Sequence, residues 1–165
     1  VIEEKAYMGG KSIENKGGNI LDFLARNEIS NNAVLIEIKT PKTPVLGSKY
    51  RDNAYSISKD ISGAIVQVAN YRHYLQREFL TLSDTYLDEI NSFEPKCLII
   101  VGNFFEQLDN PTKKRSFELF RENLNSIQVI TYDELFGKVK MLIELLEGGT
   151  EDYQEDPFFD DDLPF

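Results

Sequence analysis

The stretch Val34-Leu35-Ile36-Glu37-Ile38-Lys39 places an acid and a base two residues apart inside an otherwise apolar segment. Side chains alternate between the two faces of a strand, so we expect Val34, Ile36 and Ile38 to fill the core. Glu37 and Lys39 should then lie side by side on the other face. Ionised groups near a core are costly unless they are paired or bind a metal, which favours a chemical role. The alternative is a half-buried strand with a solvated charged edge.

A second apolar run, from Ile20 to Ala25, contains the acid Asp22, and the polar residues between the two runs indicate a hairpin turn. A turn closed around residues 28–31 places Asp22 opposite Glu37. Directly opposed residues hold their Cβ atoms about 4.5 to 5.5 Å apart. Two carboxylates at this separation can share one hard cation.

Gln67 and Tyr71 follow four residues apart on a helical segment, so they share one helix face. The order Asp22, Glu37-Ile38-Lys39, Gln67-x-x-x-Tyr71 resembles the signature of PD-(D/E)XK nucleases. The surrounding sequence resembles the C-terminal nuclease domain of Shedu anti-phage defence proteins. The resemblance is carried by three segments, VLIEIKTPKTPVL at 34–46, YSIS at 55–58 and GAIVQVANYR at 63–72. The resemblance runs from about Lys11 to Leu146, with Leu21 rather than proline before the acid.

This resemblance implies a restriction-endonuclease-like α/β sandwich, with a central mixed sheet flanked by helices, that hydrolyses phosphodiester bonds in DNA. It implies that Asp22, Glu37 and the carbonyl of Ile38 bind Mg²⁺, for which Mn²⁺ can substitute. Lys39 would orient or activate the attacking water, and Gln67 would position Lys39 or that water. Tyr71 would brace the helix, although it could equally be a core residue.

The formal charge of −10 argues against a nucleic-acid partner until its distribution is considered. Residues 147–165 carry eight acids and no base, so residues 1–146 have a charge of −2. The segment from Lys39 to Arg77 contains seven bases and only two acids. This excess of positive charge would attract the phosphates of a nucleic acid. We therefore expect Lys42, Lys49 and Arg51 to contact the DNA backbone, with a solvated basic turn as the alternative.

The remaining chain predicts strands that alternate with helices, the pattern of an α/β fold with a mixed sheet. We expect an irregular loop over 40–57, because Pro41, Pro44 and Gly47 interrupt it. Ser58 is expected to cap a helix that continues to about residue 93, with Gly63 marking a close approach of this helix to the sheet. The other expected elements are a strand at 2–13 with a bend at Gly9-Gly10, a buried strand at 96–102, a helix at 110–124, a strand at 127–130 and a capped amphipathic helix from Thr131 with Leu135, Val139, Leu142 and Leu146 on its apolar stripe. The single cysteine, Cys97, is expected to be a buried structural thiol.

We divide the chain into a nuclease domain at 1–147 and an acidic tail at 148–165. The tail is too acidic and too poor in aliphatic residues to pack by itself. It finishes Asp160-Asp161-Asp162-Leu163-Pro164-Phe165, which resembles the tip of bacterial single-stranded-DNA-binding proteins. That resemblance implies a partner-binding tip that docks a protein able to bind such tails. A solubilising tail or an appended sequence is the alternative.

No apolar run reaches the roughly 18 to 20 residues of a membrane helix, so we expect a cytoplasmic protein without a membrane partner. The chain begins with Val1 and leaves no room for the helix that normally precedes the first strand of this nuclease fold. We therefore expect a fragment whose N-terminal sensor region is missing, taken from a protein that forms a homo-oligomer. The alternative to a nuclease is a non-catalytic module that binds DNA ends or a repair protein through its acidic tip.

Overall fold

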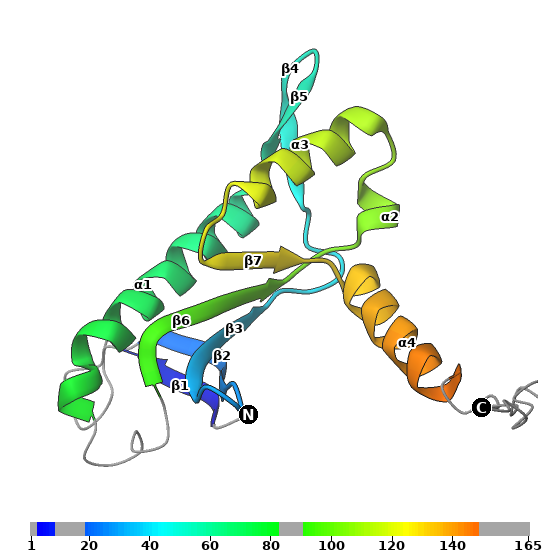
Figure 1. Ribbon diagram of the computed structural model, residues 1–165. Helices are drawn as coiled ribbons and strands as arrows, with labels where there is room; N and C mark the ends of the chain where they lie inside the picture. The colour runs from blue at the N-terminus through cyan, green and yellow to red at the C-terminus, as the bar shows by residue number, and fades with distance from the viewer. Residues whose placement is uncertain (1–2, 9–18, 83–90, 149–165) are drawn as a thin grey trace, which may run out of the picture.

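A five-stranded mixed sheet organises the molecule (Figure 1). The structure is a computed structural model that describes residues 3–8, 19–82 and 91–148. Its elements are β1 (Glu3–Met8), β2 (Asn19–Arg26), β3 (Asn32–Ile38), β4 (Leu46–Arg51), β5 (Ala54–Ile57), α1 (Lys59–Leu82), β6 (Asn91–Ile100), α2 (Phe104–Gln107), α3 (Pro111–Glu122), β7 (Ile127–Ile130) and α4 (Tyr132–Gly148). The sheet order is β1-β2-β3-β6-β7, and β4 pairs only with β5. The expected mixed α/β architecture is therefore present.

The sheet joins an antiparallel meander to a parallel half. β1, β2 and β3 pair antiparallel, whereas β3 pairs parallel with β6, and β6 with β7. Helix α1 is the crossover that leads toward β6, and it packs on β3 and β6. Its buried stripe consists of Ile61, Ala64, Val68, Tyr71 and Leu75. The carboxyl ends of the three parallel strands consequently lie at one edge of the sheet.

The prediction of which β3 side chains are buried was wrong. Ala33, Leu35 and Glu37 are buried, whereas Ile38 is 36% exposed. The alternation itself is correct, with Val34 and Ile36 half-buried on the opposite face to Glu37. Because α1 packs on β3, we attribute the burial of the face that carries Glu37 to this helix. The acid therefore lies on the better-buried face.

The expected loop over 40–57 contains a two-stranded hairpin, β4–β5. The backbone N–H of Tyr55 donates to Ser116 Oγ of α3 at 3.1 Å, so α3 holds the hairpin at β5, close to its turn. A Cβ at Gly47 would lie 2.6 Å from Ser56 Oγ and 3.2 Å from the carbonyl oxygen of Ile57, so a larger residue would require both groups to shift. Figure 1 shows the hairpin projecting away from the sheet beside α3.

The predicted helix from Phe79 to Phe93 was wrong at its C-terminal end, because β6 already begins at Asn91. Residues 83–90 lie outside the described part of the chain. Pro95 is accommodated at a register shift between β3 and β6, as expected for proline in a sheet. Arg72 of α1 stabilises this irregularity, since its Nε donates to Pro95 O at 3.1 Å and its guanidinium pairs with Glu94 at 3.2 Å.

The predicted helix starts are confirmed. Ser58 Oγ accepts from the N–H of Ile61, and Asn110 Oδ1 accepts from the N–H of Lys113. The N–H of Thr131 donates to Glu134 Oε2 at 3.0 Å, which is the reciprocal half of a capping box. Local hydrogen bonds thus start three of the helices where their sequences predict.

The expected apolar stripe of α4 exists but is not buried. Val139 is 48% exposed, Leu142 57% and Leu146 70%, and none of the residues of α4 is buried. In Figure 1 this helix projects from the sheet without packing on it. The expected extension of the first strand over residues 9–13, the bend at Gly9-Gly10 and the acidic tip at 160–165 lie outside the described residues. Within the described ranges, no helix has the length and apolar character to cross a membrane.

Candidate active site

Asp22 and Glu37 lie opposite each other on β2 and β3. The pairing includes Phe23 with Ile36, and continuing it by one residue opposes Asp22 to Glu37, as the turn predicted. Asn31 closes this turn with a φ of 54°, a conformation that asparagine tolerates. Asp22 Oδ2 accepts from the backbone N–H of Ile38 at 2.7 Å, which fixes one carboxylate against the adjacent strand.

Glu37 is buried at 3% exposure, and its two carboxylate oxygens differ. Oε1 forms an ion pair with Lys39 Nζ at 2.7 Å. Oε2 is buried and has no hydrogen-bond partner among the described residues. Burial raises the pKa of Glu37, Lys39 opposes this rise, and the charge of Asp22 adds to it. The site therefore contains one carboxylate oxygen with unused acceptor capacity.

The main chain of Lys39 is held on both sides. Its N–H donates to Ile100 O of β6 at 2.8 Å, and its carbonyl accepts from Tyr132 Oη of α4 at 2.8 Å. Sequence reasoning did not single out Tyr132. The only available signal was its place at the start of a capped helix. Tyr132 is thus a positioning residue for the strand end that carries Lys39.

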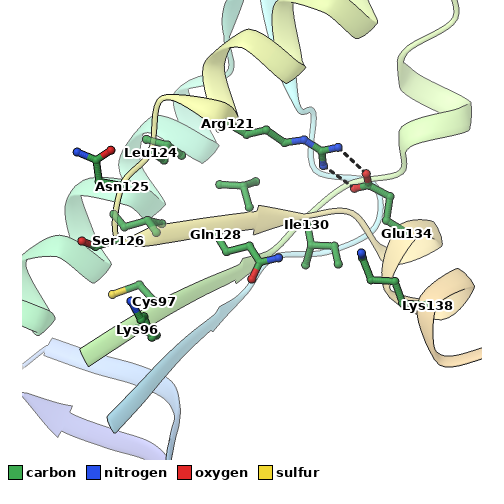
Figure 2. A pocket seen from close by; sticks show the side chains of 12 residues that line it. Lys96, Cys97, Arg121, Leu124, Asn125, Ser126, Gln128, Ile130, Glu134 and Lys138 are labelled. Carbon is green, nitrogen blue, oxygen red and sulfur yellow. Dashed lines mark hydrogen bonds and ion pairs between the residues drawn. The ribbon is translucent and has the colours of Figure 1, made fainter. Parts of the chain in front are cut away.

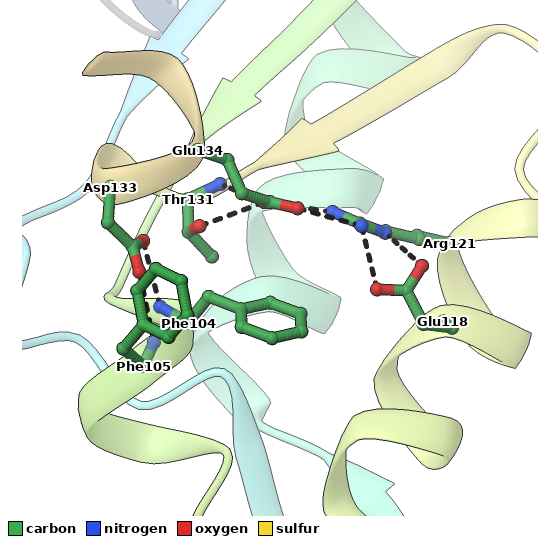
Figure 3. Close-up of polar contacts among 7 residues, drawn as sticks. All are labelled: Phe104, Phe105, Glu118, Arg121, Thr131, Asp133 and Glu134. Atoms are coloured by element: carbon green, nitrogen blue, oxygen red, sulfur yellow. Dashed lines mark hydrogen bonds and ion pairs between the residues drawn. The ribbon is translucent and has the colours of Figure 1, made fainter. Parts of the chain in front are cut away.

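The hydrogen bonds drawn in Figure 3 fix the start of α4, and with it Tyr132. Arg121 of α3 forms ion pairs with Glu118 and Glu134 at 2.7 and 2.8 Å. Burial would raise the pKa of Glu134, but hydrogen bonds from Arg121 and Thr131 outweigh it and lower that pKa. Asp133 accepts from two backbone N–H groups at the start of α2, both at 2.9 Å.

Gln67 and Tyr71 come together on α1 as their spacing predicts. Gln67 Nε2 donates to Tyr71 Oη at 2.7 Å, and Tyr71 is 2% exposed. Burial raises the pKa of Tyr71, the bond from Gln67 opposes this, and the charges of Glu37 and Asp22 act on the same hydroxyl. Because α1 packs on β3, this helix face lies on the side of the sheet that carries Glu37.

An open cavity of about 450 Å³ lies on this face, lined by Gly63, Val66, Gln67, Asn70 and Tyr71. The expectation that Gly63 marks a close approach to the sheet was wrong, because a Cβ there would meet nothing within 4 Å. The missing side chain instead leaves space one turn before Gln67.

The donor set beside Lys39 fits a hard divalent cation. The carboxylates of Asp22 and Glu37 provide oxygen donors, and the free Oε2 of Glu37 is an unpaired buried oxygen of the kind that such a cation binds. Within the described residues, no group of three or more His, Cys, Asp or Glu side chains could hold a metal. A cation here would therefore keep several positions for water or phosphate, as Mg²⁺ commonly does.

The three bases predicted to bind DNA lie outside this cluster. Lys42 is exposed in the segment after β3, while Lys49 and Arg51 are exposed on the hairpin. Lys49 pairs weakly with Asp52 at 3.5 Å, and Arg51 lies 5.4 Å from the ring centre of Tyr50, which is 72% exposed. No described contact joins these bases to Glu37 or Lys39, so they form a separate basic surface.

The segment between Lys39 and the hairpin is held by α2 and the turn before it. Gln107 donates from Nε2 to the carbonyls of Pro41 and Thr43 and accepts at Oε1 from the N–H of Val45. Gly102 has a φ of +65°, and a Cβ there would lie 2.5 Å from Val45 Cγ1. This glycine is required for both its backbone conformation and the close contact. The hairpin therefore begins from a fixed point.

Comparison with known proteins relates these residues to one protein family. A family model described as Shedu protein SduA, C-terminal, matches residues 2–136. Shedu protein SduA of Bacillus cereus (strain B4264) is 44% identical over 154 residues, which cover 90% of this chain and 40% of that protein. The chain thus spans less than half the length of this curated relative.

Proposed function

This chain belongs to the family of Shedu SduA C-terminal domains, and we propose that it is a metal-dependent DNA endonuclease with a restriction-endonuclease-like fold. We further propose that it is the effector domain of a cytoplasmic anti-phage defence protein, whose sensor region precedes these residues. The observation that carries the proposal is Glu37 Oε2, a buried carboxylate oxygen with no hydrogen-bond partner among the described residues. A purely structural ion pair with Lys39 gives no reason for this oxygen to be left unsatisfied.

In the proposed reaction, Asp22, Glu37 and the Ile38 carbonyl would hold Mg²⁺ or Mn²⁺. The bound cation would supply positive charge to the scissile phosphate and lower the pKa of a water. Lys39 is held through its main chain by Ile100 and Tyr132, and its ammonium lies beside Glu37. It orients the attacking water in line with the leaving oxygen. Gln67 helps to position Lys39 or the water, and Tyr71 fixes Gln67 through their hydrogen bond.

Lys39 Nζ lies 2.7 Å from Glu37 Oε1 and forms an ion pair with it. Its role is therefore to stabilise charge and orient the nucleophile rather than to remove a proton. DNA is the proposed substrate because Lys49 and Arg51 present exposed positive charge on a hairpin that follows the catalytic strand.

The test is cleavage of supercoiled plasmid DNA with Mg²⁺, Mn²⁺ or EDTA. Glu37→Ala and Lys39→Ala should each reduce the rate by at least on the order of 10²-fold, because each removes a group that acts in the transition state. The matched control is Lys59→Ala, an exposed base at the start of α1. Circular dichroism should show unchanged secondary structure in all three variants. Cleavage at the parent rate by both site variants would remove the catalytic assignment and leave a DNA-binding or partner-binding module.

A further inference from the structure

A groove runs along β7, the edge strand of the sheet, and reaches Lys96 and Cys97 of the neighbouring strand β6 (Figure 2). It has a volume of about 560 Å³, and its apolar lining comes from Cys97, Leu124, Ile127, Val129 and Ile130. The catalytic cluster of Asp22, Glu37 and Lys39 does not contribute to it. This groove therefore needs an explanation separate from DNA cleavage.

Two lysines provide the unbalanced charge of the groove. Lys96 and Lys138 are exposed and have no ion-pair partner in the described part of the chain. Arg121 is already paired with Glu118 and Glu134, at the end of the groove that Figure 2 shows beside Lys138. Figure 2 also shows Lys96 near the opposite end of β7. The groove thus has an apolar floor between two available positive charges.

The sequence after α4 has the complementary chemistry. Asp160-Asp161-Asp162 supplies three negative charges, and Leu163-Pro164-Phe165 supplies apolar side chains directly after them. An extended acidic segment followed by an aromatic anchor suits a groove with a basic end and an apolar floor.

Chain length permits this segment to reach the groove of its own molecule. Helix α4 has 17 residues and begins beside the groove, so the tail must return over about 25 Å at 1.5 Å per residue. Residues 149–159 connect Gly148 to Asp160 and can span up to about 36 Å when extended. A tail that returns along α4 meets Lys138 before the apolar floor, which matches the order of acids and apolar residues.

We propose that residues 160–165 dock into the β7 groove of the same chain, with the aspartates toward Lys138 and Phe165 on the apolar floor. The tip is then masked in the isolated chain, and a tail-binding partner has to compete with the groove for it. The proposal does not depend on nuclease activity.

Backbone amide NMR spectra of the intact chain without DNA test this docking. Phe165→Ala and Lys138→Glu should each shift the amide signals of Ile127–Ile130 and raise their hydrogen-exchange rates by on the order of tenfold, because both release the tip. The matched control, Lys140→Glu, changes the same charge on α4 at a residue that does not line the groove, and it should leave these signals in place. Reversing the charges of Asp160, Asp161 and Asp162 to lysine in the Lys138→Glu background should restore the original shifts.

Two results would overturn the proposal. The first is a set of β7 signals that does not respond to Phe165→Ala or to Lys138→Glu. The second comes from isotope-labelled chain that lacks residues 160–165, mixed with unlabelled intact chain. Return of its β7 signals to the intact positions would show that the tip binds a second copy rather than its own molecule.

Discussion

At the scale of the residue, Glu37 is buried at a cost to the folded state. Burial raises its pKa despite the ion pair with Lys39, so the surroundings disfavour the ionised form that the proposed chemistry requires. One of its oxygens also lacks a hydrogen bond among the described residues. Such conflicts between local stability and chemistry are typical of active sites.

We predict that Glu37→Gln increases thermal stability while it abolishes cleavage. The neutral amide removes the buried charge and retains the side-chain shape, and a gain of about 1 kcal/mol corresponds to roughly 2–4 °C in Tm for a chain of this size. Calorimetry in EDTA measures the change. Glu28→Gln, at an exposed turn residue, is the control and should leave Tm unchanged. A lower Tm for Glu37→Gln would mean that the pair with Lys39 outweighs the burial cost.

The sequence predicts the pairing of Asp22 with Glu37 because turn length determines hairpin register. It does not predict that Glu37 lies on the better-buried face. Strand alternation separates the two faces, but the position of α1 decides which one is covered. The hydrogen bond from Tyr132 to the Lys39 carbonyl joins residues that are 93 positions apart in the sequence. Local sequence patterns therefore carry no information about it.

At the scale of the element, hairpin β4–β5 presents Lys49 and Arg51, and it is held by Gln107 just before β4 and by Ser116 at Tyr55 of β5. We predict that replacing both bases with alanine weakens DNA binding and reduces the slope of log affinity against log salt by about 0.9 per lost phosphate contact. Fluorescence anisotropy over a salt series measures this slope. The double variant Lys59→Ala, Lys140→Ala, at two exposed bases outside the hairpin, is the charge-matched control. An unchanged slope in the hairpin variant would exclude these bases from the DNA surface.

The hairpin was missed because Pro41, Pro44 and Gly47, which lie close together in the sequence, are all residues that favour turns. In the structure, Pro41 and Pro44 precede the hairpin, and Gly47 allows close strand approach. Helix starts were predicted correctly because Ser58, Asn110 and Thr131 make hydrogen bonds within three residues. The early start of β6 was missed because a strand that contains Pro95 needs a bulge, and only pairing with β3 shows it.

At the scale of the whole molecule, α4 leaves large apolar side chains in solvent. Leu135, Val139, Leu142 and Leu146 follow a four-three-four spacing, which is the seam of paired helices. Because a second copy has the same seam, this surface supports the proposal that the protein forms homo-oligomers. The sequence predicted the stripe, but periodicity does not distinguish a helix that packs within its own chain from one that packs against another.

We predict that the chain self-associates and that Leu142→Glu shifts it toward the monomer, because the seam would have to bury a charge. Sedimentation equilibrium over a concentration series measures the change. Lys140→Glu, at an exposed position outside the seam, should leave the association constant within about threefold, as rim charges contribute little. A parent chain that is monomeric throughout the series would show that α4 does not pair with itself.

Cys97 of β6 is 2% exposed, and burial raises the pKa of its thiol to about 11. Only the thiolate reacts readily with alkylating reagents, so this side chain is protected twice, by lack of access and by protonation. It can be modified only when β6 separates from its neighbours. Because it is the single cysteine, the rate of its alkylation measures how often the central sheet opens. A cysteine added at an exposed position could carry a dye or spin label without removal of the native thiol.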